Sequence, residues 1–241
     1  MNASKQKLTI LHGWGGSRET WQTFIDLAKT TYDVEVIELP CFGDEPCPTD
    51  VWGVEEYAEF VKSKIQNEKS KIILLGHSFG GQVATVLTAR YPELVDKLIL
   101  SGAAVIRPKK YIKRGIFYIL AKCATIIEYL PCAKSCKEKI KNLFYHIIKS
   151  PDFKKTSGIQ TNIYKKIIRQ DVQSYLKHIN TPTLVIWGKQ DSYVPLRYGK
   201  RIASQIKNST FEILPHAGHG LHIKQPDIFL HKIKKFIAYL D

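Results

Sequence analysis

The sequence predicts an α/β protein built on a mostly parallel sheet, and three observations support this fold class. Short apolar runs alternate with segments of helical periodicity before position 107 and after position 180. One apolar run, Lys71–Leu75, leads directly into a Gly-x-Ser-x-Gly pattern at positions 76–80. The stretch between the two alternating regions carries helical periodicity and no convincing strand. We therefore expect one sheet of about six strands flanked by helices and interrupted by a helical insertion.

The expected strands are short runs rich in aliphatic and β-branched residues. Six such runs occur, at Lys7–His12, Val34–Leu39, Lys71–Leu75, Leu98–Ser101, Thr183–Trp187 and Phe211–Leu214. Helical patterns lie between them at Thr20–Thr30, Val54–Asn67, Phe79–Tyr91, Pro195–Gln205 and Pro226–Leu240. This alternation is typical of parallel strands joined by crossover helices.

The insertion at positions 103–180 is expected to form a helical lid on a core made of residues 1–102 and 181–241. Apolar residues recur at spacings of three and four over Tyr111–Leu130, Lys137–Lys149 and Ile159–Ile179, which gives each segment one apolar face. Six apolar residues of the insertion are expected to roof a pocket and favour an acyl or aryl chain over a sugar. They are Val105, Ile116, Phe117, Ile119, Leu120 and Phe144.

Most of the excess charge of the chain lies in this lid. The whole sequence holds 36 Lys and Arg against 22 Asp and Glu, a net charge of +14. Positions 107–177 hold 17 basic and four acidic residues, whereas the remainder holds 19 against 18. Such a surface could recruit an acidic acyl carrier protein or lie on an anionic membrane surface. A solvated face without a partner stays open, and the lack of a nucleic-acid-binding motif argues against nucleic acid.

Composition and cysteine usage favour a globular cytoplasmic protein without a cofactor. No run of about 18 apolar residues predicts a spanning helix, and the polar start lacks the apolar core of a secretory signal. The five cysteines are an odd number in a chain too large to need disulfides, which fits a reducing compartment. Cys132 and Cys136 lie four apart, but no second Cys or His pair nearby completes a zinc site, so we expect no metal.

Ser78 is the candidate nucleophile. It sits at the centre of the Gly-x-Ser-x-Gly pattern, after an apolar strand and before a helical pattern. A serine raised on a sharp strand-to-helix turn needs very small neighbours two residues away on either side, and Gly76 and Gly80 supply them. Taken alone, the two glycines could also belong to an ordinary turn.

A serine hydroxyl needs a base, and that base needs an orienting acid. His219 follows the last expected strand and Asp191 follows the one before it, so both can return to the carboxyl end of the sheet, where Ser78 lies. The order Ser78, Asp191, His219 is the one expected when a triad is carried by successive strand ends.

Each assignment has a competitor. His216 and His222 flank His219 and have an equal claim on spacing alone. Asp191 could be a turn residue, while Asp171 and Asp227 lie within helical patterns and are less free to reach the serine. His77, beside the nucleophile, is expected to point away from it and to act as a packing or hydrogen-bonding neighbour.

Acyl transfer also needs hydrogen-bond donors for the negative oxygen of its tetrahedral intermediate. We assign one to the backbone N–H of Phe79, which follows the nucleophile at a helix start. The second is assigned to the backbone N–H of Trp14, in the glycine-rich loop after the first strand, with its indole lining the pocket.

Taken together, these motifs resemble those of the α/β-hydrolase superfamily over essentially the whole chain. LHGWGGSRETW resembles the oxyanion loop, VIELPCFGDEP the turn after the second strand, GHSFGG the nucleophile elbow, TPTLVIWGKQDSYVP the acid strand and LPHAGHGLHIKQPDIF the histidine loop. In that last motif the first His of G-H-x-x-H is catalytic, so the resemblance selects His219.

The resemblance has three departures. Cys41 stands where the family usually has glycine, and Glu45 where it usually has serine, which would alter the pocket entrance. The antiparallel hairpin that commonly leads the family's sheet is not expected here, so the sheet should be smaller than the usual eight strands.

The resemblance implies a carboxylic ester hydrolase acting through an acyl-enzyme. Serine at the elbow argues against dehalogenases and epoxide hydrolases, and a basic lid is a poor fit to aminopeptidases that bind a substrate ammonium through acidic residues. The nearest resemblance is to the pimeloyl-carrier-protein methyl ester esterases of biotin synthesis, although these usually have Trp where this chain has His77. A small-molecule ester, a carrier-bound ester or thioester, and a lid that only binds acidic partners remain the alternatives.

Overall fold

A computed structural model describes residues 5–107 and 156–240, and it contains one six-stranded sheet. All neighbouring strands pair in parallel, in the order β2-β1-β3-β4-β5-β6. The strands are β1 (Lys7–Leu11), β2 (Asp33–Ile37), β3 (Ile72–His77), β4 (Val95–Ser101), β5 (Thr183–Gly188) and β6 (Ser209–Leu214). The predicted mostly parallel sheet is confirmed, and each strand lies within a few residues of its expected position.

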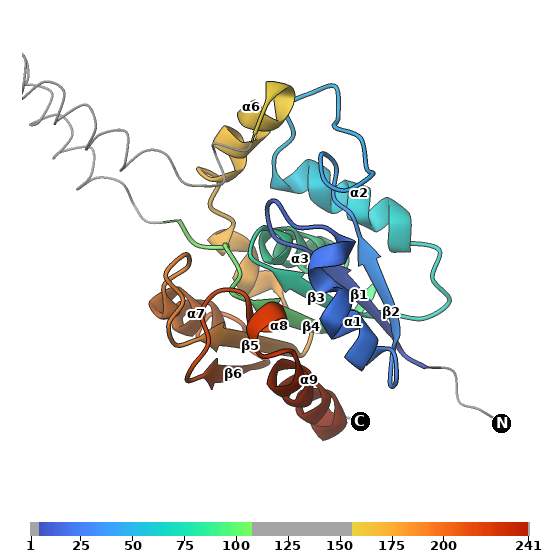
Figure 1. Ribbon diagram of the computed structural model, residues 1–241, viewed down its shortest axis with the longest axis vertical. Helices are drawn as coiled ribbons and strands as arrows, with labels where there is room; N and C mark the ends of the chain where they lie inside the picture. The colour runs from blue at the N-terminus through green and yellow to red at the C-terminus, as the bar shows by residue number, and fades with distance from the viewer. Residues whose placement is uncertain (1–4, 108–155, 241) are drawn as a thin grey trace, which may run out of the picture.

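Helices cover both faces of the sheet (Figure 1). One face packs against α1 (Gln22–Ala28), α8 (Leu221–Lys224) and α9 (Pro226–Leu240), with the short 3-10 helix η1 (Arg18–Trp21) beside them. The other face packs against α2 (Val54–Ile65), α3 (Phe79–Arg90) and α7 (Leu196–Ala203). Two buried apolar clusters, one on each face, therefore hold the sheet between helical layers.

The strand order reverses direction at β1. The chain runs from β1 outward to β2, then returns past β1 to β3 and continues away from it. Such a switch point leaves a crevice at the carboxyl ends of the two diverging strands, which is where open α/β sheets bind ligands. The loops that follow β1 and β3 both begin at this crevice, and they carry Trp14 and Ser78.

The segment predicted as a helix over Ile159–Ile179 is two elements in the structure. They are α6 (Gly158–Ile167) and the 3-10 helix η3 (Gln173–His178). Between them the Asp171 carboxylate accepts the backbone N–H groups of Gln173 at 2.8 Å and of Arg107 at 2.8 Å. An Asp that bonds its own backbone two residues on competes with the helical ladder, which explains the interruption.

The other lid segments proposed from the sequence, Tyr111–Leu130 and Lys137–Lys149, lie outside the described residues. So do five of the six residues expected to roof a pocket. The sixth, Val105, is buried in the apolar cluster on the α2 and α3 face.

A disulfide between Cys41 and Cys47 departs from the expectation of free thiols. The loop after β2 folds back on itself, since the Cys41 N–H donates to the carbonyls of Glu45 and Pro46, and the two Cα atoms lie 4.1 Å apart. Cys41 has a φ of 76°, a conformation that favours glycine. The conformation of Cys41 therefore suits the glycine that usually stands at this position in the family that the sequence resembles.

The elbow between β3 and α3 depends on close backbone contact. A Cβ atom added to Gly80 would lie 2.2 Å from the Leu11 carbonyl oxygen and 2.6 Å from that of His12. One added to Gly76 would lie 2.6 Å from the Gly80 carbonyl oxygen. Because these neighbours are backbone atoms, no side-chain movement can relieve the overlap.

Gly80→Ala should therefore destabilise the fold by at least about 3 kcal/mol, at the upper end of the usual range for overpacking. Gly218→Ala is the matched control, because its added Cβ has one neighbour, at 3.9 Å. Urea unfolding of both variants measures the difference. Similar midpoints for the two would contradict this account of the elbow.

Candidate active site

Ser78 occupies the sharp turn between β3 and α3 in a strained conformation. Its φ is 52° and its ψ is −113°, which a non-glycine residue holds only when its surroundings enforce it, at a typical cost of about 1–3 kcal/mol. The surroundings here are hydrogen bonds to the end of β4. The Ser78 N–H donates to the Ser101 carbonyl at 3.0 Å, and the Ser78 carbonyl accepts the Ala104 N–H at 2.9 Å.

Asp191 and His219 form a hydrogen-bonded pair. The His219 Nδ1 lies 2.7 Å from the Asp191 Oδ2, and the carboxylate side chain is fully buried. The other oxygen, Oδ1, accepts the backbone N–H groups of Tyr193 at 2.9 Å and Val194 at 2.8 Å. Because the carboxylate only accepts when ionised, it holds Nδ1 as the donor and leaves Nε2 of His219 to act as a base.

The pair lies beside the turn of Ser78. A Cβ added to Gly102 would come within 3.0 Å of His219 Nδ1 and 3.4 Å of Asp191 Oδ2, so the pair rests against the bare Gly102 backbone. In the sequence, Gly102 lies between Ser101 and Ala104, the two residues at and just beyond the end of β4 that bond the Ser78 backbone. Within the described part of the chain, no hydrogen bond joins the Ser78 hydroxyl to His219; in unliganded enzymes this bond is often long.

The competing histidines have other surroundings. His216 is exposed, and His222 stacks on Trp21 with ring centroids 3.8 Å apart. His77 donates through Nδ1 to the Ser101 carbonyl at 3.0 Å, as expected of a hydrogen-bonding neighbour. Its ring centroid is 4.7 Å from that of His219, and Tyr193 stacks at 5.3 Å from His219. His219 therefore packs against two aromatic rings, and Tyr193 is a neighbour of the candidate site that the sequence analysis missed.

The structure also distinguishes the three candidate acids by their partners. Asp171 bonds the backbone between α6 and η3, as described above, and Asp227 lies in the first turn of α9. Only Asp191, of these three, is bonded to His219 in the described structure.

Burial keeps two of the neighbouring histidines neutral. It lowers the pKa of His222 to about 3, with a smaller contribution from the charge of His219. Burial, with help from the same charge, also holds the pKa of His77 well below its usual range. Because their pKa values are low, His77 and His222 are weak bases and do not compete with His219 as the candidate base.

The two residues that carry the expected oxyanion donors belong to an aromatic cluster. Neither the Trp14 N–H nor the Phe79 N–H has an acceptor among the described residues. The Trp14 ring packs against Phe42 at 4.8 Å, Phe79 at 5.6 Å and Tyr164 of α6 at 4.9 Å between centroids. Phe42 and Tyr164 were not predicted, because the sequence carries no signal that two loops and α6 meet here.

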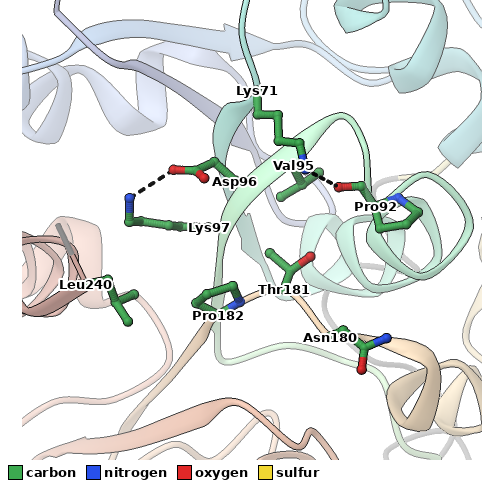
Figure 2. A pocket seen from close by; sticks show the side chains of 9 residues that line it. All are labelled: Lys71, Pro92, Val95, Asp96, Lys97, Asn180, Thr181, Pro182 and Leu240. Carbon is green, nitrogen blue, oxygen red and sulfur yellow. Dashed lines mark hydrogen bonds and ion pairs between the residues drawn. The ribbon is translucent and has the colours of Figure 1, made fainter.

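A pocket lies at the amino ends of the central strands, at the other end of the sheet from Ser78 (Figure 2). It encloses about 420 Å³ and is lined by Lys71, Pro92, Val95, Asp96, Lys97, Asn180, Thr181, Pro182 and Leu240, at the amino ends of β3, β4 and β5. Lys71 donates to the Pro92 carbonyl and Lys97 pairs with Asp96 at 2.9 Å. Its charged groups thus already have protein partners, and the candidate nucleophile, Ser78, is not among its lining residues.

Among the described residues, no group of three or more His, Cys, Asp or Glu side chains is arranged to hold a metal ion. No helix in this part of the chain is long and apolar enough to cross a membrane.

The fold and this site define a serine hydrolase of the α/β-hydrolase superfamily. Residues 2–226 match the family model described as serine aminopeptidase, S33, and the chain belongs to that family.

Sequence similarity to known proteins extends along nearly the whole chain. The chain is 28% identical to the uncharacterized hydrolase YugF of Bacillus subtilis, covering 98% of this chain and 91% of the relative. It is 30% identical to the pimeloyl-[acyl-carrier protein] methyl ester esterase of Wigglesworthia glossinidia brevipalpis, covering 95% and 93%. A thermophilic esterase from Thermogutta terrifontis shares the fold, with a TM-score of 0.71, 21% identity and coverage of 98% and 90%.

The neutral His222 predicts a pH dependence of stability. Unfolding returns the pKa from about 3 to the ordinary 6.5, so the unfolded chain binds more protons between these values. Stability from this group is complete above pH 6.5 and falls as the pH is lowered towards 3. His222→Phe should flatten that fall by up to about 1.4 kcal/mol per pH unit, because Phe can stack on Trp21 without titrating.

Urea unfolding between about pH 4 and pH 7 measures this slope. His216→Gln is the control and should leave it unchanged, since the His216 side chain is exposed when folded and unfolded. An unchanged slope in His222→Phe would show that His222 does not titrate as described.

Proposed function

We propose that the protein is a serine carboxylesterase in which Ser78, His219 and Asp191 form the catalytic triad. The observation that carries this proposal is the buried Asp191–His219 pair, bonded at 2.7 Å beside a serine whose φ is 52°. The three residues come from the carboxyl ends of β3, β5 and β6, as a triad on this fold requires.

In the first half of the reaction, the Ser78 hydroxyl oxygen attacks the ester carbonyl carbon while His219 Nε2 takes its proton. The N–H groups of Trp14 and Phe79 stabilise the oxyanion that forms. As the intermediate collapses, the carbon–oxygen bond to the alcohol breaks and His219 returns the proton to the leaving alkoxide. Ser78 then carries the acyl group.

In the second half, water attacks the acyl-enzyme and gives its proton to His219. The acid is released when the Ser78 ester bond breaks and the proton returns to the serine oxygen. Asp191 stays ionised throughout and holds the imidazole ring in one tautomer.

An ester is favoured over a peptide by two observations. The Trp14, Phe42, Phe79 and Tyr164 rings supply an apolar wall next to the donors, which suits an acyl or aryl chain. The charge of positions 107–177, 17 basic against four acidic residues, is a poor fit to recognition of a substrate ammonium. The second candidate function is cleavage of amino-terminal residues from peptides, because the matched family is described as serine aminopeptidase.

For the natural substrate we propose an acyl ester or thioester on an acidic carrier protein in the cytoplasm. We also propose that residues 1–102 and 181–241 form the core and residues 103–180 a basic lid, and the excess of Lys and Arg in that segment supports recruitment of an acidic partner. The carrier-protein esterase from Wigglesworthia, which the chain resembles at 30% identity, supports the same substrate class. An anionic membrane surface is the competing partner for the same charge.

Ser78→Ala should abolish hydrolysis of p-nitrophenyl esters, and Asp191→Asn should lower kcat by roughly 10⁴-fold, because the imidazole loses its orienting charge. Asp227→Asn is the control and should retain activity, since Asp227 lies in the first turn of α9 and is not bonded to His219 in the described structure. Rates are compared over a series of acyl chain lengths. Equal rates for wild type and Ser78→Ala would exclude the proposal, and faster cleavage of aminoacyl p-nitroanilides would favour the peptidase.

Recruitment by charge predicts a salt effect that depends on the substrate. Raising NaCl from about 50 to about 300 mM should increase KM for a carrier-bound methyl ester by roughly tenfold, because salt screens the lid from the carrier. KM for the free methyl ester should stay within about twofold. Equal responses would indicate a solvated lid face, and retention on anionic vesicles in place of the carrier would indicate the membrane.

A further inference from the structure

His12, at the end of β1, is completely buried and bonded through both ring nitrogens. Its Nδ1 lies 2.8 Å from the Gly13 carbonyl oxygen, and its Nε2 lies 3.0 Å from the backbone nitrogen of Leu39. A carbonyl oxygen only accepts and a backbone N–H only donates. The ring must therefore carry its proton on Nδ1 and keep a lone pair on Nε2.

The first of these bonds fixes the peptide between Gly13 and Trp14. The Gly13 carbonyl also accepts the Gly16 N–H at 3.0 Å, so two donors hold it on one side. The C=O and N–H of a trans peptide point in opposite directions. The Trp14 N–H is thus directed away from His12, and it has no acceptor among the described residues.

This peptide lies against the nucleophile. A Cβ added to Gly13 would lie 3.2 Å from the Cβ of Ser78 and 3.1 Å from Cδ2 of His77. The His12 carbonyl also accepts the Gly80 N–H of the elbow at 3.1 Å, which ties the end of β1 to the turn of Ser78. An N–H directed away from His12 in this position faces the side where the oxyanion would form.

The peptide needs such a restraint because its own sequence does not provide one. Gly13 precedes it and Gly15 follows Trp14, and glycine accepts backbone conformations on both sides of the map. A rotated Gly13–Trp14 peptide would present its carbonyl, not its N–H, to the substrate oxygen, and the oxyanion would then meet a negative dipole.

We propose that His12 is a positioning residue that holds the Gly13–Trp14 peptide with its N–H directed at the oxyanion formed at Ser78. His12 touches neither the substrate nor the reacting atoms and acts through the peptide. This inference rests on the proposed function. Burial also lowers the pKa of His12, which keeps the ring in the neutral form that can accept the Leu39 N–H.

Two substitutions separate this role from packing. In His12→Asn the amide nitrogen takes the place of Nδ1 and can still donate to the Gly13 carbonyl. In His12→Gln the longer amide takes the place of Nε2 and leaves the Gly13 carbonyl without that donor. Both remove the ring from its edge contact with Phe42, at 5.4 Å between centroids, so a packing role would affect them alike.

The measurement is the rate at which a fluorophosphonate probe labels Ser78, together with kcat and KM for a p-nitrophenyl ester. His12→Gln should lose about 100- to 1,000-fold in labelling rate and in kcat, as removal of one oxyanion donor does, with KM within about twofold. His12→Asn should stay within roughly tenfold of wild type. Equal losses in two folded variants, or no loss in either, would overturn the proposal.

Labelling separates the failure of this inference from failure of the esterase assignment. A wild type that labels but hydrolyses no ester would reject the substrate class, and the Asn-to-Gln labelling ratio would still decide the role of His12. If either variant fails to fold, the wild type provides the test. Long-range ¹H–¹⁵N correlation should show His12 as the neutral Nδ1–H tautomer, and an Nε2–H tautomer or an imidazolium would overturn the proposal.

Discussion

The contact between the end of β1 and the elbow after β3 is the constraint on which the rest of the site depends. The Gly80 N–H donates to the His12 carbonyl at 3.1 Å, and a Cβ at Gly80 would lie 2.2 Å from the Leu11 carbonyl oxygen. Only a glycine lets α3 begin so close to β1. That closeness places the loop of Trp14 beside Ser78, because the two strands are hydrogen-bonded neighbours. The positions of the candidate nucleophile and of its expected oxyanion donors therefore depend on one backbone contact at the switch point of the sheet.

The buried polar side chains around this contact each have defined hydrogen-bond or stacking partners. Asp191 accepts three hydrogen bonds, while His12 is bonded at both nitrogens. His77 donates to Ser101, and His222 stacks on Trp21 with its pKa lowered to about 3 by burial. Among these groups His219 alone combines a paired Nδ1 with partial exposure, 16% of its side chain. The surroundings thus favour His219 as the candidate imidazole for proton transfer.

The proposed lid and the proposed core would make separate contributions to the proposed function. The candidate reacting groups follow the carboxyl ends of strands in the core. The described part of the proposed lid reaches this candidate site through Tyr164, which packs on Trp14, and through the Gln160 side chain, which donates to the Cys41 carbonyl at 2.9 Å. Cys41 belongs to the loop closed by the disulfide. The aromatic wall next to Ser78 therefore brings together the loop of Trp14, the disulfide loop and α6, which are distant in the sequence. Substrate choice is expected to depend on this wall and on the charge of the lid, and the chemistry on the core.

The sequence by itself determined the class of fold and the candidate nucleophile, since both depend on short-range patterns. Apolar runs located all six strands, and the spacing of Gly76, Ser78 and Gly80 indicated the elbow before any contact was known. Only the tertiary structure separated His219 from His216 and His222 on physical grounds, by its bond to Asp191, because three nearby histidines have the same chemistry until burial and partners distinguish them. The bonds of His12, the stacking of Tyr193 and the Cys41–Cys47 disulfide likewise depend on how loops approach one another. That approach is set by packing between segments far apart in the sequence, so residue patterns along the chain do not predict it.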